Sequence, residues 1–108
     1  FACFDVRPGH IAQSVCDPAD YGVAACAAEE LRGSDPATNC TRLSAALRGE
    51  DTLAHREALV LGAALALVVT GQSATLADGV AAARETIASG AAASFLERLT
   101  QFGANERQ

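Results

Sequence analysis

The first sixteen residues alternate between apolar and polar side chains on either side of a turn. Phe4 and Val6 alternate with charged neighbours, Arg7-Pro8-Gly9 is typical of a tight turn, and residues 11–15 continue the extended pattern. Residues 1–16 are therefore predicted to form a β-hairpin. An isolated hairpin is marginal in water, so these strands are expected to need the following helices or a sheet supplied from outside.

From residue 24 onward the apolar positions follow a helical period and are punctuated by caps and glycines. Asp35 and Thr75 are predicted to cap helix starts, and Pro36 fits a first turn, where its missing N–H costs nothing. The expected helices span about 24–31, 36–48, 52–70, 76–89 and 91–102, and residues 103–108 are expected to form a frayed tail. The predicted fold class is α+β: one hairpin and four or five helices in a single domain, or domain fragment, over residues 1–108.

The third predicted helix is apolar on every side over residues 58–69, so it is expected to be buried on every side. Ala58, Gly62 and Ala66 form a ridge of small side chains at four-residue spacing, and Gly62 is expected to pack against another helix or a partner backbone. The candidate interface consists of this ridge together with Phe4 and Val6 of the hairpin.

The last predicted helix places Phe95, Leu99 and Phe102 on one face, which is expected to point inward. Half of the residues are apolar, many of them alanine, with no Trp and no Met. Such small side chains make a shallow core, so a protein partner or a missing upstream domain is expected to contribute stability. Because no Met stands at position 1, the sequence also indicates a removed leader or an absent upstream region, in a cytoplasmic or organellar protein.

The charge balance disfavours two classes of partner. Eight Arg and no Lys face thirteen acidic residues, for a net charge of −5. Nucleic acids and anionic membrane surfaces attract basic faces, so neither is expected as a partner. The longest apolar run has twelve residues, at 58–69, and a bilayer span needs about 20. No membrane span is therefore predicted.

The four cysteines fit no zinc-binding spacing. Cys3, Cys16, Cys26 and Cys40 all lie in the first forty residues, and none forms a Cys-x-x-Cys pair. They are interpreted as small buried apolar residues. Two disulfides in a small secreted protein remain an alternative.

Titratable and nucleophilic residues form no catalytic pattern along the chain. His10 and His55, the pair Glu29-Glu30, and Asp17 with Asp20 are each expected on the solvated surface. No serine has a nucleophile-elbow context, and no glycine-rich loop suits a phosphate. The sequence therefore predicts no catalytic residue, no metal ligand and no cofactor-binding residue in this chain.

From Val6 to Leu99 the order of these signals resembles the C-terminal part of the anthranilate phosphoribosyltransferase family. The matching pieces are the hairpin Phe4-Asp5-Val6-Arg7-Pro8-Gly9-His10-Ile11, Asp17-Pro18-Ala19-Asp20-Tyr21-Gly22, Leu31-Arg32-Gly33-Ser34-Asp35-Pro36-Ala37-Thr38-Asn39, Leu47-Arg48-Gly49-Glu50, Ala64-Leu65-Ala66-Leu67-Val68-Val69-Thr70-Gly71, Leu76-Ala77-Asp78-Gly79-Val80 and Ala88-Ser89-Gly90-Ala91-Ala92. Gly62 stands where the family usually has Asn, and Cys40 where it usually has Ala.

This resemblance implies the closing segment of an α/β domain, which completes a sheet and covers it. The family joins anthranilate to phosphoribosyl pyrophosphate in tryptophan synthesis. Its pyrophosphate-binding Gly-Thr-Gly-Gly-Asp loop and magnesium-binding Asp-Glu pair lie upstream of everything matched here, so no catalytic residue carries over. The alternative is a structural subunit, without enzymatic activity, reused in a larger assembly such as one in an organelle.

Overall fold

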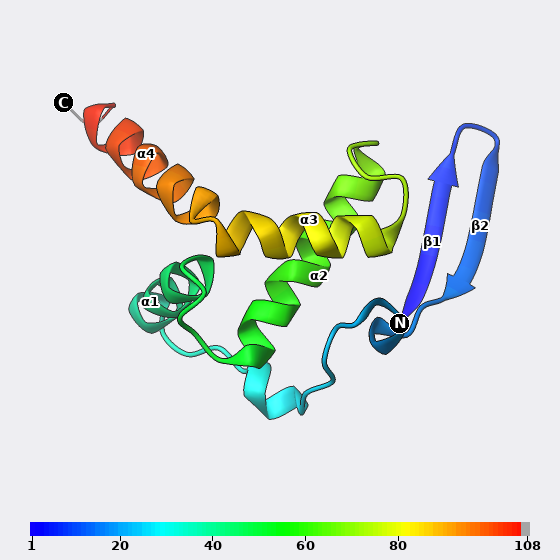
Figure 1. Cartoon of the computed structure of the whole chain (residues 1–108), viewed down its shortest axis with the longest axis horizontal. Helices are drawn as coiled ribbons and strands as arrows, with labels where there is room; N and C mark the ends of the chain where they lie inside the picture. Colours follow the sequence, from blue (N-terminus) through cyan, green and yellow to red (C-terminus); the bar gives the residue numbers. More distant parts are fainter. Residues whose placement is uncertain (107–108) are drawn as a thin grey trace.

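The chain folds into an N-terminal hairpin followed by four α-helices (Figure 1). The coordinates are a computed structural model, which describes residues 1–106. The predicted α+β class is therefore confirmed. The elements are β1 (Ala2–Arg7), β2 (His10–Val15), two short 3-10 helices (Pro18–Tyr21 and Ala28–Leu31), α1 (Pro36–Leu47), α2 (Leu53–Val69), α3 (Leu76–Ala88) and α4 (Ala91–Asn105).

The predicted hairpin forms with a two-residue turn. β1 and β2 pair antiparallel, with Ala2 opposite Val15 at one end and Arg7 opposite His10 at the other. Gly9 has a φ of +73°, and Pro followed by Gly at positive φ is the pattern of a type II turn. The hairpin therefore follows from local sequence alone.

Helix starts also follow the predicted caps. The Asp35 carboxylate accepts a hydrogen bond from the Thr38 backbone N–H at 3.0 Å. The Thr75 hydroxyl accepts one from the Asp78 N–H at 3.1 Å. Each bond satisfies a backbone donor that the first helical turn leaves free, and this fixes where α1 and α3 begin.

Two predicted helices differ from those observed. Residues 24–27 form no helix, and only Ala28–Leu31 make a 3-10 turn. The reason is tertiary, because Val23 is buried and the Ala24 backbone N–H donates to the Glu57 side chain at 3.2 Å. α4 runs through Gly103 to Asn105 instead of ending before that glycine. A helix tolerates an interior Gly at a cost of about 1 kcal/mol.

The predicted tail over residues 103–108 is thus helical at its start. Residues 107–108 lie outside the described part of the chain.

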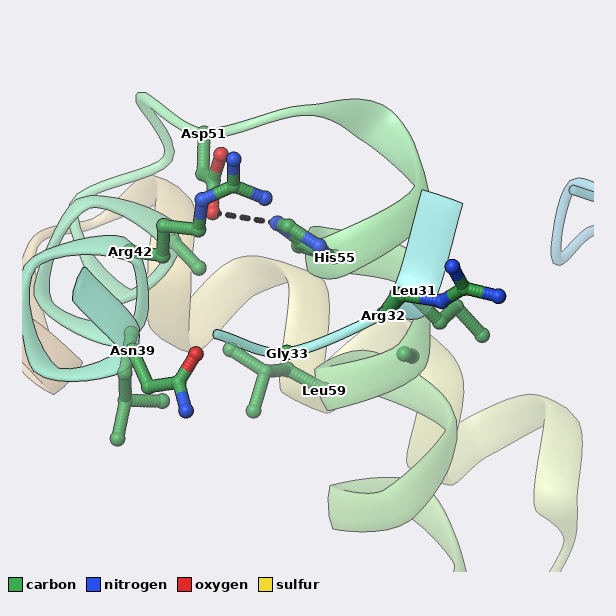
Figure 2. Close-up of a pocket in the computed structure, with 11 residues that line it drawn as sticks. Leu31, Arg32, Gly33, Asn39, Arg42, Asp51, His55 and Leu59 are labelled. Carbon is green, nitrogen blue, oxygen red and sulfur yellow. Dashed lines mark hydrogen bonds and ion pairs between the residues drawn. The ribbon is translucent and has the colours of Figure 1, made fainter. Parts of the chain in front are cut away.

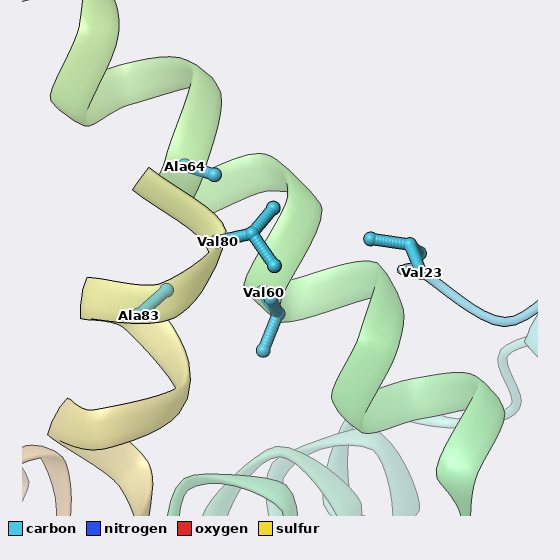
Figure 3. Close-up of a cluster of buried hydrophobic side chains, with 5 residues drawn as sticks. All are labelled: Val23, Val60, Ala64, Val80 and Ala83. Atoms are coloured by element: carbon cyan, nitrogen blue, oxygen red, sulfur yellow. The ribbon is translucent and has the colours of Figure 1, made fainter. Parts of the chain in front are cut away.

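The core lies where α2 and α3 cross. Figure 3 shows the cluster between these helices. Gly79 of α3 lies directly against α2, since a Cβ built on it would be 2.8 Å from the Ala64 carbonyl oxygen. The glycine therefore sets the distance between the two helices. The cluster consists of Val23, Val60, Ala64, Val80 and Ala83.

The close approach predicted at Gly62 is not made by any helix within residues 1–106. No atom lies within 4 Å of a Cβ built at Gly62. α2 is also not buried on every side, because Ala58, Gly62 and Ala66 are all exposed. The face that packs on α3 contains Ala64 instead. The part of the prediction that places Gly62 against another helix of this chain is therefore wrong, whereas its contact with a partner backbone stays a prediction.

The inward face predicted for α4 is wrong as well. Phe95, Leu99 and Phe102 are 60%, 53% and 65% exposed. The cause is the direction of α4, which leaves the end of α3 and projects away from the crossing of α2 and α3 (Figure 1). Over the same residues 1–106, no helix is long and apolar enough to cross a membrane.

Candidate functional site

The most prominent surface feature is apolar and uncovered. In the observed register, alternate residues of β1 and β2 share one face of the hairpin. The large apolar side chains on this face are highly exposed: Phe4 58%, Val6 68%, Ile11 68% and Val15 84%. We call Ala2 and these four residues the hairpin apolar face. Monomeric domains rarely leave such a face in water.

The predicted interface residues are exposed but fall on two separate surfaces. Phe4 and Val6 belong to the hairpin apolar face, and Ala58, Gly62 and Ala66 lie along α2. The two strands pack mainly on each other and make at most slight contact with α2. The fold of this chain therefore does not join the two groups into one site.

A small cleft of about 340 Å³ lies between α1, the N-terminal half of α2 and the loop before α1 (Figure 2). Asn39 holds this loop in place. Its Oδ1 accepts from the Ser34 backbone N–H at 2.8 Å, and its Nδ2 donates to the Ser34 carbonyl at 3.0 Å. The Asn39 side chain therefore replaces water as the partner of two loop groups.

Asp51 and His55 form an ion-pair-type contact at the edge of the same cleft. His55 Nδ1 lies 2.8 Å from Asp51 Oδ2, and both side chains are largely shielded from solvent. The backbone N–H of Thr52 and then the His55 contact lower the pKa of Asp51, and Arg42 adds to this effect. His55, which is predicted on the surface, lines this cleft with its side chain largely shielded, whereas His10 is exposed as predicted. The four-residue spacing of Asp51 and His55 is the signal that could have revealed the pair.

This pair does not by itself provide a catalytic centre. A carboxylate can orient an imidazole for proton transfer, but nucleophilic catalysis also needs a hydroxyl or thiol within reach. The cleft is lined by no Ser, Thr, Tyr or Cys. In the described part of the chain, no three His, Cys, Asp or Glu side chains gather as metal ligands.

Glu57 is a buried charge that the sequence reasoning did not single out. It is 8% exposed, and its Oε2 accepts from Arg84 Nη2 at 2.6 Å and from the Ala24 N–H at 3.2 Å. Arg84 Nη2 also lies 2.6 Å from the Gly22 carbonyl oxygen. This network ties the segment after the hairpin to α2 and α3. Its partners are 27 to 62 residues apart, so no local pattern reveals it.

The cysteines are free in this structure. Cys3 and Cys16 are half-buried, whereas Cys26 and Cys40 are exposed. The interpretation as buried apolar residues is therefore wrong for Cys26 and Cys40, and it holds only in part for Cys3 and Cys16. Cys16 is close enough to Tyr21 to raise the pKa of its hydroxyl.

The cap at Asp35 predicts a pH dependence. The Thr38 backbone N–H and then the Thr38 hydroxyl lower the pKa of Asp35 below its ordinary 3.8. Because the folded state has the lower pKa, the ionised cap stabilises the fold above the unfolded pKa, and this contribution is lost as pH falls through the folded value.

We expect Asp35→Asn to remain close to the parent in stability at pH 7, because Asn is also a good cap. Its stability should fall less steeply below about pH 4. Urea midpoints from pH 7 to pH 2.5 test this, and an unchanged acid limb in the variant would refute it.

Most of the chain matches a known protein family. Residues 2–93 match the family described as glycosyl transferase family, a/b domain. The chain belongs to this glycosyl transferase family. No solved structure matches it.

The curated relatives of this member of the glycosyl transferase family are much longer proteins. It is 46% identical over 93 residues to the anthranilate phosphoribosyltransferase of Methylobacterium radiotolerans, covering 86% of this chain and 27% of the relative. It is 41% identical over 102 residues to that of Sorangium cellulosum, covering 94% and 28%. It is 40% identical over 97 residues to the anthranilate phosphoribosyltransferase of Synechococcus elongatus, covering 90% of this chain and 28% of the relative. The chain thus spans little more than a quarter of these relatives, and the resemblance to their C-terminal part is confirmed.

Proposed function

We propose that this chain is the closing portion of the a/b domain of an anthranilate phosphoribosyltransferase, where its hairpin completes a sheet and its helices cover that sheet. One observation carries the proposal. A chain that matches an a/b domain over residues 2–93 leaves the hairpin apolar face in water. Layered α/β folds bury both faces of the sheet, so the rest of such a domain is the natural cover.

The exposed small residues of α2 support the same assignment. Ala58, Gly62 and Ala66 are accessible along one line of the helix, and small side chains let another backbone approach closely. In the proposed domain this line of α2 lies against the part of the protein that precedes the hairpin. Phe95, Leu99 and Phe102 of α4 form a second uncovered face that would be shielded in the same way.

We further propose that the chain supplies structure rather than catalytic groups, and holds no cofactor of its own. Expelling a diphosphate group requires a divalent cation and clustered hydrogen-bond donors. The better-shielded carboxylates here already have partners within the fold. Asp51 contacts His55, and Glu57 contacts Arg84.

The alternative role, a structural subunit of an unrelated assembly, has less support. The relatives in Methylobacterium, Sorangium and Synechococcus all carry the name of the enzyme. At 40–46% identity, the chain has kept the sequence of an enzyme segment. No surface feature of the described residues favours a different assembly over the missing part of the same domain.

A transplant tests the proposal. In the Methylobacterium radiotolerans relative, the matched 93 residues are replaced by this chain. We expect the fused protein to fold and to transfer the phosphoribosyl group within about tenfold of the parent enzyme, which corresponds to about 1.4 kcal/mol in the barrier. The lone 108-residue chain should show no magnesium-dependent turnover of phosphoribosyl pyrophosphate.

The matched control is the same fusion carrying Phe4→Asp and Val6→Asp, which places charges on the hairpin apolar face. Its activity and solubility should collapse, because buried unpaired carboxylates are costly. An inactive or unfolded parent fusion would contradict the proposed function, as would turnover by the lone chain. A doubly substituted fusion that behaves like the parent fusion would show that the hairpin apolar face is not covered.

A further inference from the structure

The hairpin has two outer edges, and the hydrogen-bond pattern shows which amides lie on each. Phe1 and Cys16 exchange both bonds, with the Phe1 amine donating to the Cys16 carbonyl at 2.7 Å and the Cys16 N–H to the Phe1 carbonyl at 2.8 Å. In an antiparallel ladder such pairs alternate with pairs whose backbone groups point outward. The outward amides are therefore those of Ala2, Phe4 and Val6 on β1, and of Ile11, Gln13 and Val15 on β2.

The two edges differ in their side chains. The outward positions of β1 are all apolar, whereas those of β2 are interrupted by Gln13 directly opposite Phe4. On its other face β2 adds His10 and Ser14. The only charged residues of β1 are at its turn end, where Arg7 Nε lies 3.1 Å from Asp5 Oδ2. Polar residues protect a strand that faces water, and interior strands of a sheet are predominantly apolar.

The position of the hairpin relative to the helices also favours β1 as the edge that pairs with further strands. In Figure 1, β1 is the strand on the side of the helices, and β2 is on the far side. Strands added beyond β1 extend the sheet toward the helical part, whose exposed α2 residues also need cover. Strands added beyond β2 lead away from the helices and leave them uncovered.

We propose that the outer edge of β1 pairs with a strand from the rest of the a/b domain, and that β2 forms the outer edge of the completed sheet. This inference rests on the proposed function. The chain accounts for 27% of the length of its Methylobacterium relative, so the remaining length can supply that strand. On the face that contains Phe4 and Val6, the side chains of the added strand are apolar, because that face is buried in the completed domain.

Amide hydrogen exchange of the transplant fusion tests the inference. The outward amides of Phe4 and Val6 are expected to exchange at least about a hundredfold more slowly in the fusion than in the lone chain. Those of Ile11, Gln13 and Val15 should change by less than about tenfold. If the fusion is insoluble, the same amides are measured after co-expression of this chain with the preceding region of the Methylobacterium relative.

Proline variants give an independent measurement. Gln13→Pro removes an outward N–H of β2 and should leave fusion activity within about threefold, since proline is tolerated at the outward positions of edge strands. Phe4→Pro should reduce activity at least about tenfold more than Phe4→Ala, because it also removes a ladder donor.

The outcomes separate the two claims. Protection of the β2 amides alone, or of both sets, in a folded fusion overturns the edge assignment and leaves the proposed function standing. Protection of neither set overturns the edge assignment and also the claim that the hairpin completes a sheet. The absence of any folded fusion or complex overturns both.

Discussion

Replacing Gly79 with alanine is expected to destabilise the chain by about 1–3 kcal/mol, because the new methyl group overpacks a helix crossing. A Cβ at this position would lie 2.8 Å from the carbonyl oxygen and 3.0 Å from the Cα of Ala64. These are backbone atoms of α2, so relief requires the two helices to move apart. That movement would also loosen Val60 and Val80 in the core.

The same substitution at Gly62 is the matched control. Gly62 is also an interior helical glycine, but nothing lies within 4 Å of a Cβ built there. Alanine should therefore stabilise the lone chain by about 0.5–1 kcal/mol through helix propensity.

Urea unfolding of both variants at one fixed chain concentration measures the difference. A stabilising Gly79→Ala would show that α2 and α3 are not in close contact. A destabilising Gly62→Ala would show that something covers that face even in the lone chain.

Replacing Arg84 with alanine is expected to cost about 1.5–3 kcal/mol, the range for losing a hydrogen bond to a buried charged group. Glu57 would remain at 8% exposure without its cation, and the Gly22 carbonyl would lose its 2.6 Å donor. The Arg84 side chain is itself 42% exposed, so water can partly replace it. The larger penalties of fully buried pairs are therefore not expected.

Arg48→Ala provides the comparison. Arg48 pairs with Glu50 at 3.0 Å, but both side chains are about half exposed, and such surface pairs contribute about 0–1 kcal/mol. Double replacement of Glu57 and Arg84 by Gln and Met should recover part of the loss, because no unpaired charge is then buried. Equal unfolding midpoints for Arg84→Ala and Arg48→Ala would contradict the role assigned to this network.

Local chemistry made much of the fold predictable. The Pro8-Gly9 turn, the caps at Asp35 and Thr75, and the glycines just after α1 and α2 each act within a few residues. The family resemblance could also be predicted from the sequence, because it rests on short motifs that follow one another in a fixed order. No catalytic or metal pattern was predicted from the sequence.

What could not be predicted depends on contacts between distant residues. Small side chains occur on several faces of α2, so the sequence could not show that Ala64 rather than Gly62 faces α3. The non-helical path at Ala24 depends on Glu57, 33 residues later. The outward direction of α4 cannot be derived from its own amphipathic pattern, because that pattern predicts a buried face whereas no element within residues 1–106 covers Phe95 and Phe102.

The solution state of the lone 108-residue chain tests the central claim most directly. According to this account, the rest of an a/b domain covers the hairpin apolar face and the face of α4 that contains Phe95, Leu99 and Phe102. Without that cover, the lone chain should associate or be loosely packed. Sedimentation velocity and thermal unfolding over a hundredfold range of chain concentration measure this. We predict self-association or a broad, concentration-dependent transition. A strictly monomeric chain with a sharp, concentration-independent transition would contradict the account.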